Sequence, residues 1–120
     1  MDGEGRKISK KLGNSPGVTE LVSQYGADVL RLWVSSENYR QDIRLSPEIL
    51  TRMQDAYRKI RNTLRYLLGN VYDFDPARNS IPYEQMLDID RWAMQQLAKL
   101  IDEVTEAYDN FVFHRVFSLL

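Results

Sequence analysis

The sequence from Ser46 to Val71, SPEILTRMQDAYRKIRNTLRYLLGNV, carries the strongest structural signal in the chain. Ser46 is a preferred helix cap, Pro47 suits the first helical turn, and an acidic residue follows it. Apolar residues then recur every three or four positions, at Ile49, Leu50, Met53, Ala56, Tyr57, Ile60, Leu64, Leu67, Leu68 and Val71. This spacing forms one face of a helix and predicts a long amphipathic helix.

A second long helix is predicted after a connecting loop. The loop is expected at residues 73–82, because Pro76 and Pro82 cannot continue a helix. Apolar residues from Trp92 to Tyr108 predict a helix that begins near Asp88 or Asp90 and packs antiparallel on the first. A third helical pattern opens at residues 111–117. The fold class is therefore predicted as mainly α, with the antiparallel long helices of a truncated helical bundle at residues 46–120.

Shorter elements are predicted upstream, at residues 15–45. Ser15 and Pro16 can begin a short amphipathic helix that ends at Gly26, and Asp28 can cap a second one. Residues 39–45 alternate well enough for a short extended segment. This part is predicted to connect the N-terminal loop to the bundle.

Residues 1–14 contain three glycines among charged residues and lack an apolar face, so we expect a flexible loop that is disordered in the isolated chain. The chain thus begins with a loop that has no supporting strand and ends on two leucines without a helix cap. We expect a piece of a longer protein.

The composition excludes several classes of protein. The chain has 120 residues, 43% of them hydrophobic, a net charge of −1 and no cysteine, so disulfide frameworks and thiolate metal sites are excluded. No apolar run approaches the roughly 20 residues that cross a bilayer, and no secretion signal opens the chain. We expect a cytoplasmic monomer without a membrane segment and without a metal site.

The N-terminal loop is the main candidate for chemistry. Residues 5–14 read GRKISKKLGN and place four cations and a hydroxyl between glycines. Several ammonium groups on bendable backbone can converge on a polyphosphate, each through strong charge-assisted hydrogen bonds. If the contacts form only as charge moves onto the leaving phosphates, they speed the reaction. The alternative is a solvated basic linker.

The order of residues in this loop resembles the Lys-Met-Ser-Lys-Ser loop of class I aminoacyl-tRNA synthetases, with Gly-Arg before it and Leu-Gly-Asn after it. The resemblance implies that Lys7 and Lys10 hold the ATP phosphates and stabilise the transition state, while Ser9 supports the ATP-binding loop. Ile8 replaces the family's methionine. Lys11 replaces its final serine and adds a charge.

The resemblance continues through residues 25–33, YGADVLRLW, which are similar to a Gly-Ala-Asp-x-Leu-Arg segment in the Ile, Val, Leu and Met members. Residues 39–44, 57–70 and 73–76 are most similar to the isoleucine enzyme. This implies ATP with Mg, isoleucine and tRNA(Ile) as substrates and partners. The His-x-Gly-His motif and the editing domain are absent from the sequence, so the isolated chain is expected to be inactive.

Arg58, Arg61 and Arg65 form a basic edge on the first long helix, which is a candidate for tRNA phosphates. The alternative is the solvated face that every helical bundle needs. Trp33 and Trp92 are predicted to pack in the core, and His114 to be a packing or surface residue. Two further hypotheses remain open, a free-standing helical RNA-binding module and a protein-interaction domain.

Overall fold

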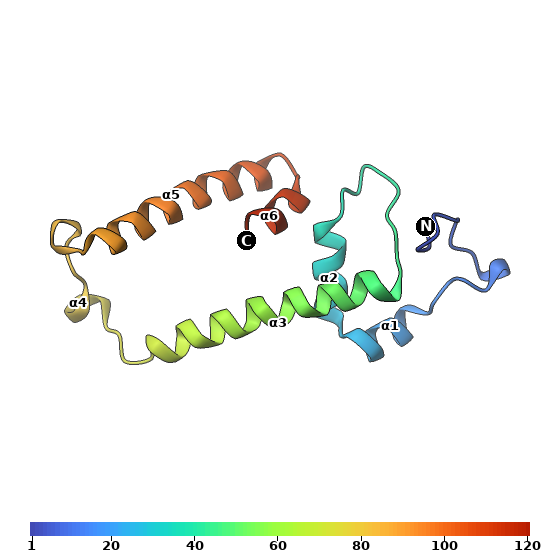
Figure 1. Cartoon of the computed structure of the whole chain (residues 1–120), viewed down its shortest axis with the longest axis horizontal. Helices are drawn as coiled ribbons and strands as arrows, with labels where there is room; N and C mark the ends of the chain where they lie inside the picture. Colours follow the sequence, from blue (N-terminus) through green and yellow to red (C-terminus); the bar gives the residue numbers. More distant parts are fainter. The chain divides into compact units, whose positions relative to one another are not determined.

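The computed structural model describes all 120 residues. They form two units, Met1–Arg61 and Asn62–Leu120, and the regular structure is entirely helical (Figure 1). The predicted mainly α class is therefore confirmed. The antiparallel packing of the two long helices remains a prediction.

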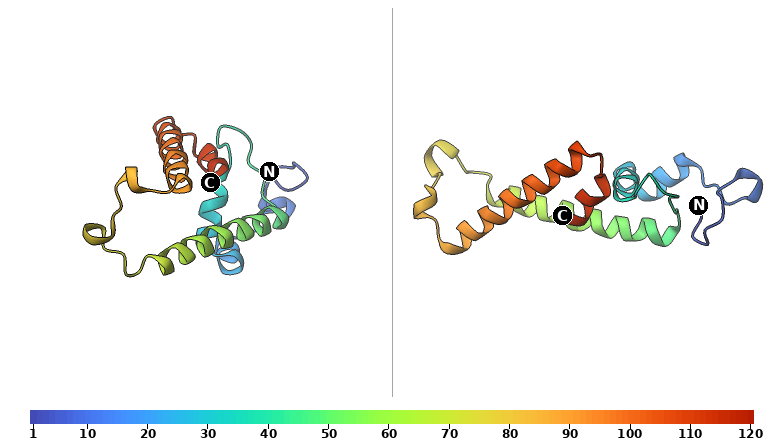
Figure 2. Two further views of the ribbon diagram at one scale, coloured as in Figure 1. Left: turned by 60° about the vertical axis from the view of Figure 1, so that its left-hand side comes forward. Right: turned by 90° about the horizontal axis from the view of Figure 1, so that it is seen from above.

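The first unit contains α1 (Val18–Tyr25) and α2 (Ala27–Ser36), which pack against each other (Figure 2). Gly26 joins them with a φ of 90°, a left-handed conformation that favours glycine. The predicted end of the first helix at Gly26 is confirmed. Val29 of α2 is buried.

Two predicted helix starts are wrong. Gly17 takes the extended N-cap position of α1, so Ser15 and Pro16 lie before the helix. The N-cap of α2 is Gly26, and Asp28 lies in the first turn. The Asp28 carboxylate accepts a hydrogen bond from Arg31 at 2.6 Å instead of capping the backbone.

The predicted long helix is α3 (Pro47–Asn70), and its start is confirmed. Ser46 caps it, because its Oγ accepts a hydrogen bond from the Ile49 amide at 3.3 Å. The first half of α3 contacts α2, where the Ser36 hydroxyl lies 3.6 Å from the Met53 sulfur. Leu50 is only 1% exposed and is the largest fully buried side chain.

The apolar stripe of α3 is buried unevenly along its length. Its first half is buried or half-buried, whereas the later leucines are exposed: Leu64, Leu67 and Leu68. The stripe therefore contributes to the core mainly through its first half.

The extended segment predicted at residues 39–45 is shorter than expected and forms no strand. A turn occupies its start, where the Gln41 amide donates to the Asn38 carbonyl at 2.9 Å. Beyond the turn, the Met1 backbone donates to the Ile43 carbonyl and accepts from the Leu45 amide. Polar side chains that favour turns account for the difference.

In the second unit, the predicted connecting loop contains the short helices α4 (Pro76–Asn79) and η2 (Tyr83–Gln85). Asp75 caps α4 by accepting from the Ala77 amide at 3.0 Å, and Pro76 takes the first helical position. Proline ends one helix but can begin another. The loop prediction missed this turn.

The second long helix, α5 (Asp88–Asp109), begins at one of the two predicted positions. Beyond it, α6 (Phe113–Leu119) folds back onto α5 (Figures 1 and 2). The third helix starts two residues later than expected, because Phe111 has a φ of 55°. Phe113 packs edge-on against Tyr108, with ring centroids 5.5 Å apart.

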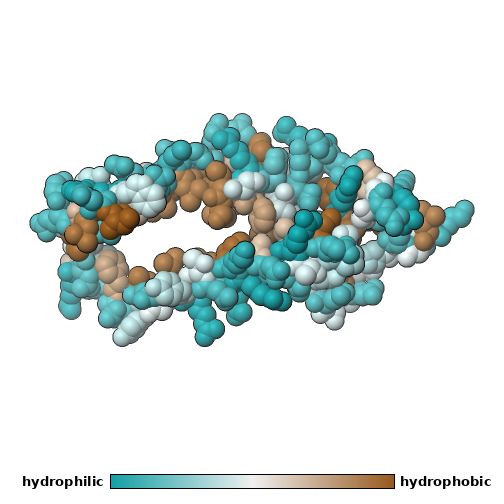
Figure 3. All heavy atoms as spheres, viewed as in Figure 1, coloured by the Kyte–Doolittle hydropathy of each residue, from teal (hydrophilic) through white to brown (hydrophobic).

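Much of the apolar surface of α5 is exposed, and Figure 3 shows apolar atoms along one side of this helix. The prediction that Trp92 lies in the core is wrong, because it is 58% exposed. Trp33 and His114 are half-buried. No helix of the chain is both long enough and apolar enough to span a bilayer.

Candidate functional site

The basic loop folds back on itself through the Asp2 backbone. The Asp2 amide donates to the Arg6 carbonyl at 2.8 Å, and the Gly5 amide donates to the Asp2 carbonyl at 3.0 Å. Gly5 has a φ of 80°, which a side chain would strain. A tight turn therefore precedes the lysines.

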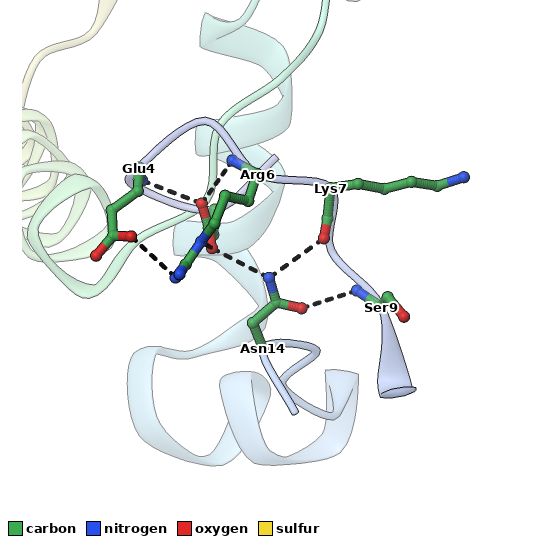
Figure 4. Close-up of polar contacts among 6 residues, drawn as sticks. Glu4, Arg6, Lys7, Ser9 and Asn14 are labelled. Carbon is green, nitrogen blue, oxygen red and sulfur yellow. Dashed lines mark hydrogen bonds and ion pairs between the residues drawn. The ribbon is translucent and has the colours of Figure 1, made fainter. Parts of the chain in front are cut away.

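The Asp2 carboxylate is the centre of a polar network that includes Glu4, Arg6 and Asn14, which are labelled in Figure 4. Its Oδ1 accepts from the amides of Glu4 and Arg6 at 3.1 and 2.8 Å, and its Oδ2 accepts from Arg6 Nε at 2.9 Å. Asn14 Nδ2 donates a further bond to Oδ2 at 3.0 Å. The side chain of Asp2 is only 13% exposed.

These hydrogen bonds hold the pKa of Asp2 well below its usual range, chiefly through the Arg6 amide and then through the Asn14 side chain. Bonds to the charged form favour that form. The contribution of Asp2 to stability is therefore present above its usual pKa and is lost only as pH falls through the lowered value. Near neutral pH the network is intact.

The Asn14 side chain closes the other end of the loop. Its Oδ1 accepts from the Ser9 amide at 2.8 Å, and its Nδ2 donates to the Lys7 carbonyl at 3.2 Å as well as to Asp2. One amide group thus joins three points of the chain. The loop is held closed at its base.

The four cations of the loop have different surroundings. Arg6 pairs with Asp2 at 2.9 Å and with Glu4 at 3.1 Å. By contrast, the lysines are exposed and lie beyond 4.0 Å from any carboxylate: Lys7, Lys10 and Lys11. Figure 4 shows the Lys7 side chain extending away from the polar network. The three lysines therefore have no acidic competitor for an anion, whereas Arg6 already contacts two carboxylates.

A short 3-10 turn, η1 (Lys10–Leu12), carries two of these lysines. Ser9 caps it, because its Oγ accepts from the Lys11 amide at 3.2 Å. Gly13 ends it in the left-handed conformation, with a φ of 68°. The hydroxyl of Ser9 thus supports the backbone that presents Lys10.

On α3, the basic edge is only partly paired. Arg58 lies 3.5 Å from Asp55 in an exposed ion pair. Arg61 and Arg65 are exposed and form no ion pair within 4.0 Å. Exposed pairs contribute little, so all three guanidinium groups can reach an anion.

Sequence reasoning treated Arg6 as one of the converging cations and gave no role to Asp2, Glu4 or Asn14. Aspartate and asparagine beside glycine commonly form hydrogen bonds to neighbouring backbone groups, so the sequence indicated local bonds at Asp2 and Asn14. This pattern does not predict that Asp2 and Asn14, which are 12 residues apart, contact each other. No group of three or more His, Asp or Glu side chains is placed to hold a metal ion.

Comparison with known proteins matches this loop and the helices that follow it. Residues 1–46 match the family described as tRNA synthetases class I (I, L, M and V). The isoleucine–tRNA ligase of Caldanaerobacter subterraneus subsp. tengcongensis is 54% identical over 117 residues, which cover 98% of this chain and 13% of that protein. This chain is a segment of the isoleucine–tRNA ligase family.

Two other isoleucine–tRNA ligases show the same correspondence. The Petrotoga mobilis protein is 52% identical over 119 residues, covering 99% of this chain and 13% of its own length. The Geobacter sulfurreducens protein is 53% identical over 114 residues, covering 95% and 12%. The resemblance seen in the sequence is confirmed, and the chain spans about 13% of the length of these ligases.

Proposed function

We propose that this segment supplies the phosphate-binding loop of an isoleucine–tRNA ligase, in which Lys7 and Lys10 contact the phosphates of ATP. The observation that supports this is the division of charge within the loop. Arg6 is paired with two carboxylates, whereas the lysines are exposed and without an acidic partner. Exposed ammonium groups without an acidic partner can donate charge-assisted hydrogen bonds to a bound polyphosphate.

The reaction is activation of isoleucine, in which the amino-acid carboxylate attacks the α-phosphorus of ATP and pyrophosphate leaves. Negative charge grows on the leaving phosphates as the bond to the α-phosphorus breaks. Ammonium groups placed beside those oxygens lower the barrier if the contacts strengthen in the transition state. Ser9 acts by capping the turn that carries Lys10. Transfer to tRNA(Ile), use of Mg with ATP, and a cytoplasmic location belong to the same proposal.

Lys7→Ala in the full-length ligase tests this role. We expect isoleucine-dependent exchange of pyrophosphate with ATP to fall about 10- to 100-fold, because one charge-assisted contact is lost. The matched control is Lys99→Ala on α5, whose ammonium group lies 3.8 Å from Glu103 and takes no part in the loop. Equal exchange in the two variants would remove Lys7 from the site.

We also propose that the basic edge of α3, defined by Arg58, Arg61 and Arg65, contacts tRNA phosphates. Its support is the exposure of these side chains on one helix, two of them without an ion pair. Phosphate contacts release counterions, so affinity depends steeply on salt.

The double variant Arg61→Gln/Arg65→Gln is expected to weaken tRNA binding by the full-length ligase and to reduce the salt slope by about two. The measurement is the dissociation constant for tRNA(Ile) at several salt concentrations. Arg78→Gln is the control. Arg78 lies outside α3 and pairs with Asp75, with 3.4 Å between the charged atoms. An unchanged slope in the double variant would show that the edge is only a solvated face.

A further inference from the structure

We propose that Asp2 and Asn14 are positioning residues for the catalytic lysines, because together they close the base of the loop and withhold Arg6 from the ligand. The inference rests on the proposed function and deepens it. It assigns the carboxylate and the amide a part in the reaction, although neither contacts a phosphate. Three observations support it.

The first observation is closure of the loop. Asp2 and Asn14 are joined by a 3.0 Å hydrogen bond between side chains, and the lysines lie in the chain between them. Asn14 also binds the backbone on both sides of Ile8, through the Lys7 carbonyl and the Ser9 amide. A glycine-rich loop without these bonds samples many more conformations. Closure therefore fixes the points from which Lys7 and Lys10 extend.

The second observation is the separation of charges. Arg6 uses Nε for Asp2 and a terminal nitrogen for Glu4, so two of its three guanidinium nitrogens are engaged within the loop (Figure 4). Lys7 is the next residue along the chain and is not paired. Without Asp2, Arg6 would compete with Lys7 for the same phosphate. The phosphate would then be held in another position.

The third observation is attachment of the loop base to the rest of the first unit. Met1 is hydrogen-bonded to Ile43 and Leu45, immediately before α3. Gly3 lies so close to the cap of α3 that an added Cβ would be 3.1 Å from the Ser46 Cβ. The Asn14 side chain, which is hydrogen-bonded to Asp2, is thereby held near the start of α3. A small misplacement of reacting groups can cost about 100-fold in rate.

The test uses Asp2→Asn in the full-length ligase. An uncharged amide offers one oxygen to four donors, so the network should loosen. Isoleucine-dependent pyrophosphate exchange is expected to fall about 10- to 100-fold, mainly in kcat, with a smaller change in the KM for ATP. The control is Asp42→Asn, the same substitution at an exposed residue without an ion pair. Asn14→Ala is the second variant and takes the place of Asp2→Asn if that protein fails to fold.

A mutant cycle with the double variant Lys7→Ala/Lys10→Ala separates positioning from general loss of structure. If Asp2 acts through the two lysines, Asp2→Asn should cost less than threefold in the Lys7→Ala/Lys10→Ala background, because the positioned groups are gone. Additive losses would overturn the inference, as would an Asp2→Asn enzyme that matches Asp42→Asn. Full activity of Lys10→Ala alone would instead contradict the proposed function.

Discussion

Lys10→Ala in the full-length ligase is expected to lower kcat for isoleucine-dependent pyrophosphate exchange about 100- to 1000-fold, the usual loss when one preorganised donor to a developing negative charge is removed. Lys10 lies in η1, between the Ser9 cap and the left-handed Gly13, so its backbone is held on both sides. Its side chain is exposed and without a carboxylate partner. Holding the backbone in this way limits the reorganisation that the Lys10 side chain would need to reach the leaving phosphates of the proposed reaction.

The loss of kcat in Lys10→Ala should exceed the loss in Lys7→Ala. Lys7 lies outside η1, and its backbone is held through its carbonyl, which accepts a hydrogen bond from Asn14. Lys99→Ala provides the control for removal of an exposed ammonium group elsewhere. A Lys10→Ala enzyme within threefold of the control would exclude Lys10 from the reaction. Lys10→Arg is expected to recover only part of the rate, because guanidinium and ammonium groups differ in shape and in hydration.

Leu50→Ala should lower the free energy of unfolding of the chain by about 2–5 kcal/mol, the range for leucine truncation in a packed core. Leu50 is 1% exposed, and the first unit has few other fully buried side chains to compensate. The loss combines the transfer free energy of the missing methyl groups with the cavity left behind. Urea unfolding followed by helical circular dichroism measures it.

The matched control is Leu64→Ala, the same substitution in the same helix at a residue that is 55% exposed. Its expected cost is below about 1 kcal/mol, because little surface is withdrawn from water. Equal losses for both variants would contradict the uneven burial of the α3 stripe.

The helices were largely predictable because their signals are local. Ser46, Pro47 and the spacing that follows predicted α3, and the acidic residues near position 88 predicted the start of α5. Gly26 ended α1 as expected, since the junction needs a positive φ. The predicted starts of α1, α2 and α6 are wrong by one or two residues. Several residues there could cap the helix, and the backbone geometry determines which position becomes the cap.

The loop network was less predictable, because it depends on side chains that meet across the chain. Sequence alone indicated that Lys7 and Lys10 could bind phosphate, but it counted Arg6 with them. Only the structure shows that Asp2 and Glu4 neutralise Arg6. The closure by Asp2 and Asn14 follows no helical or strand periodicity. Likewise, hydrophobicity placed Trp92 in a core, whereas its exposure depends on what α5 packs against.

A single-turnover measurement of isoleucyl-adenylate formation, with wild-type and Lys10→Ala full-length ligase at varied ATP, tests the central claim most directly. It separates the affinity for ATP from the rate of the chemical step. If Lys10 stabilises the departing pyrophosphate, the rate at saturating ATP falls about 100-fold or more, while the dissociation constant for ATP changes less than threefold. An unchanged rate at saturating ATP would contradict the account, whether or not ATP binds more weakly.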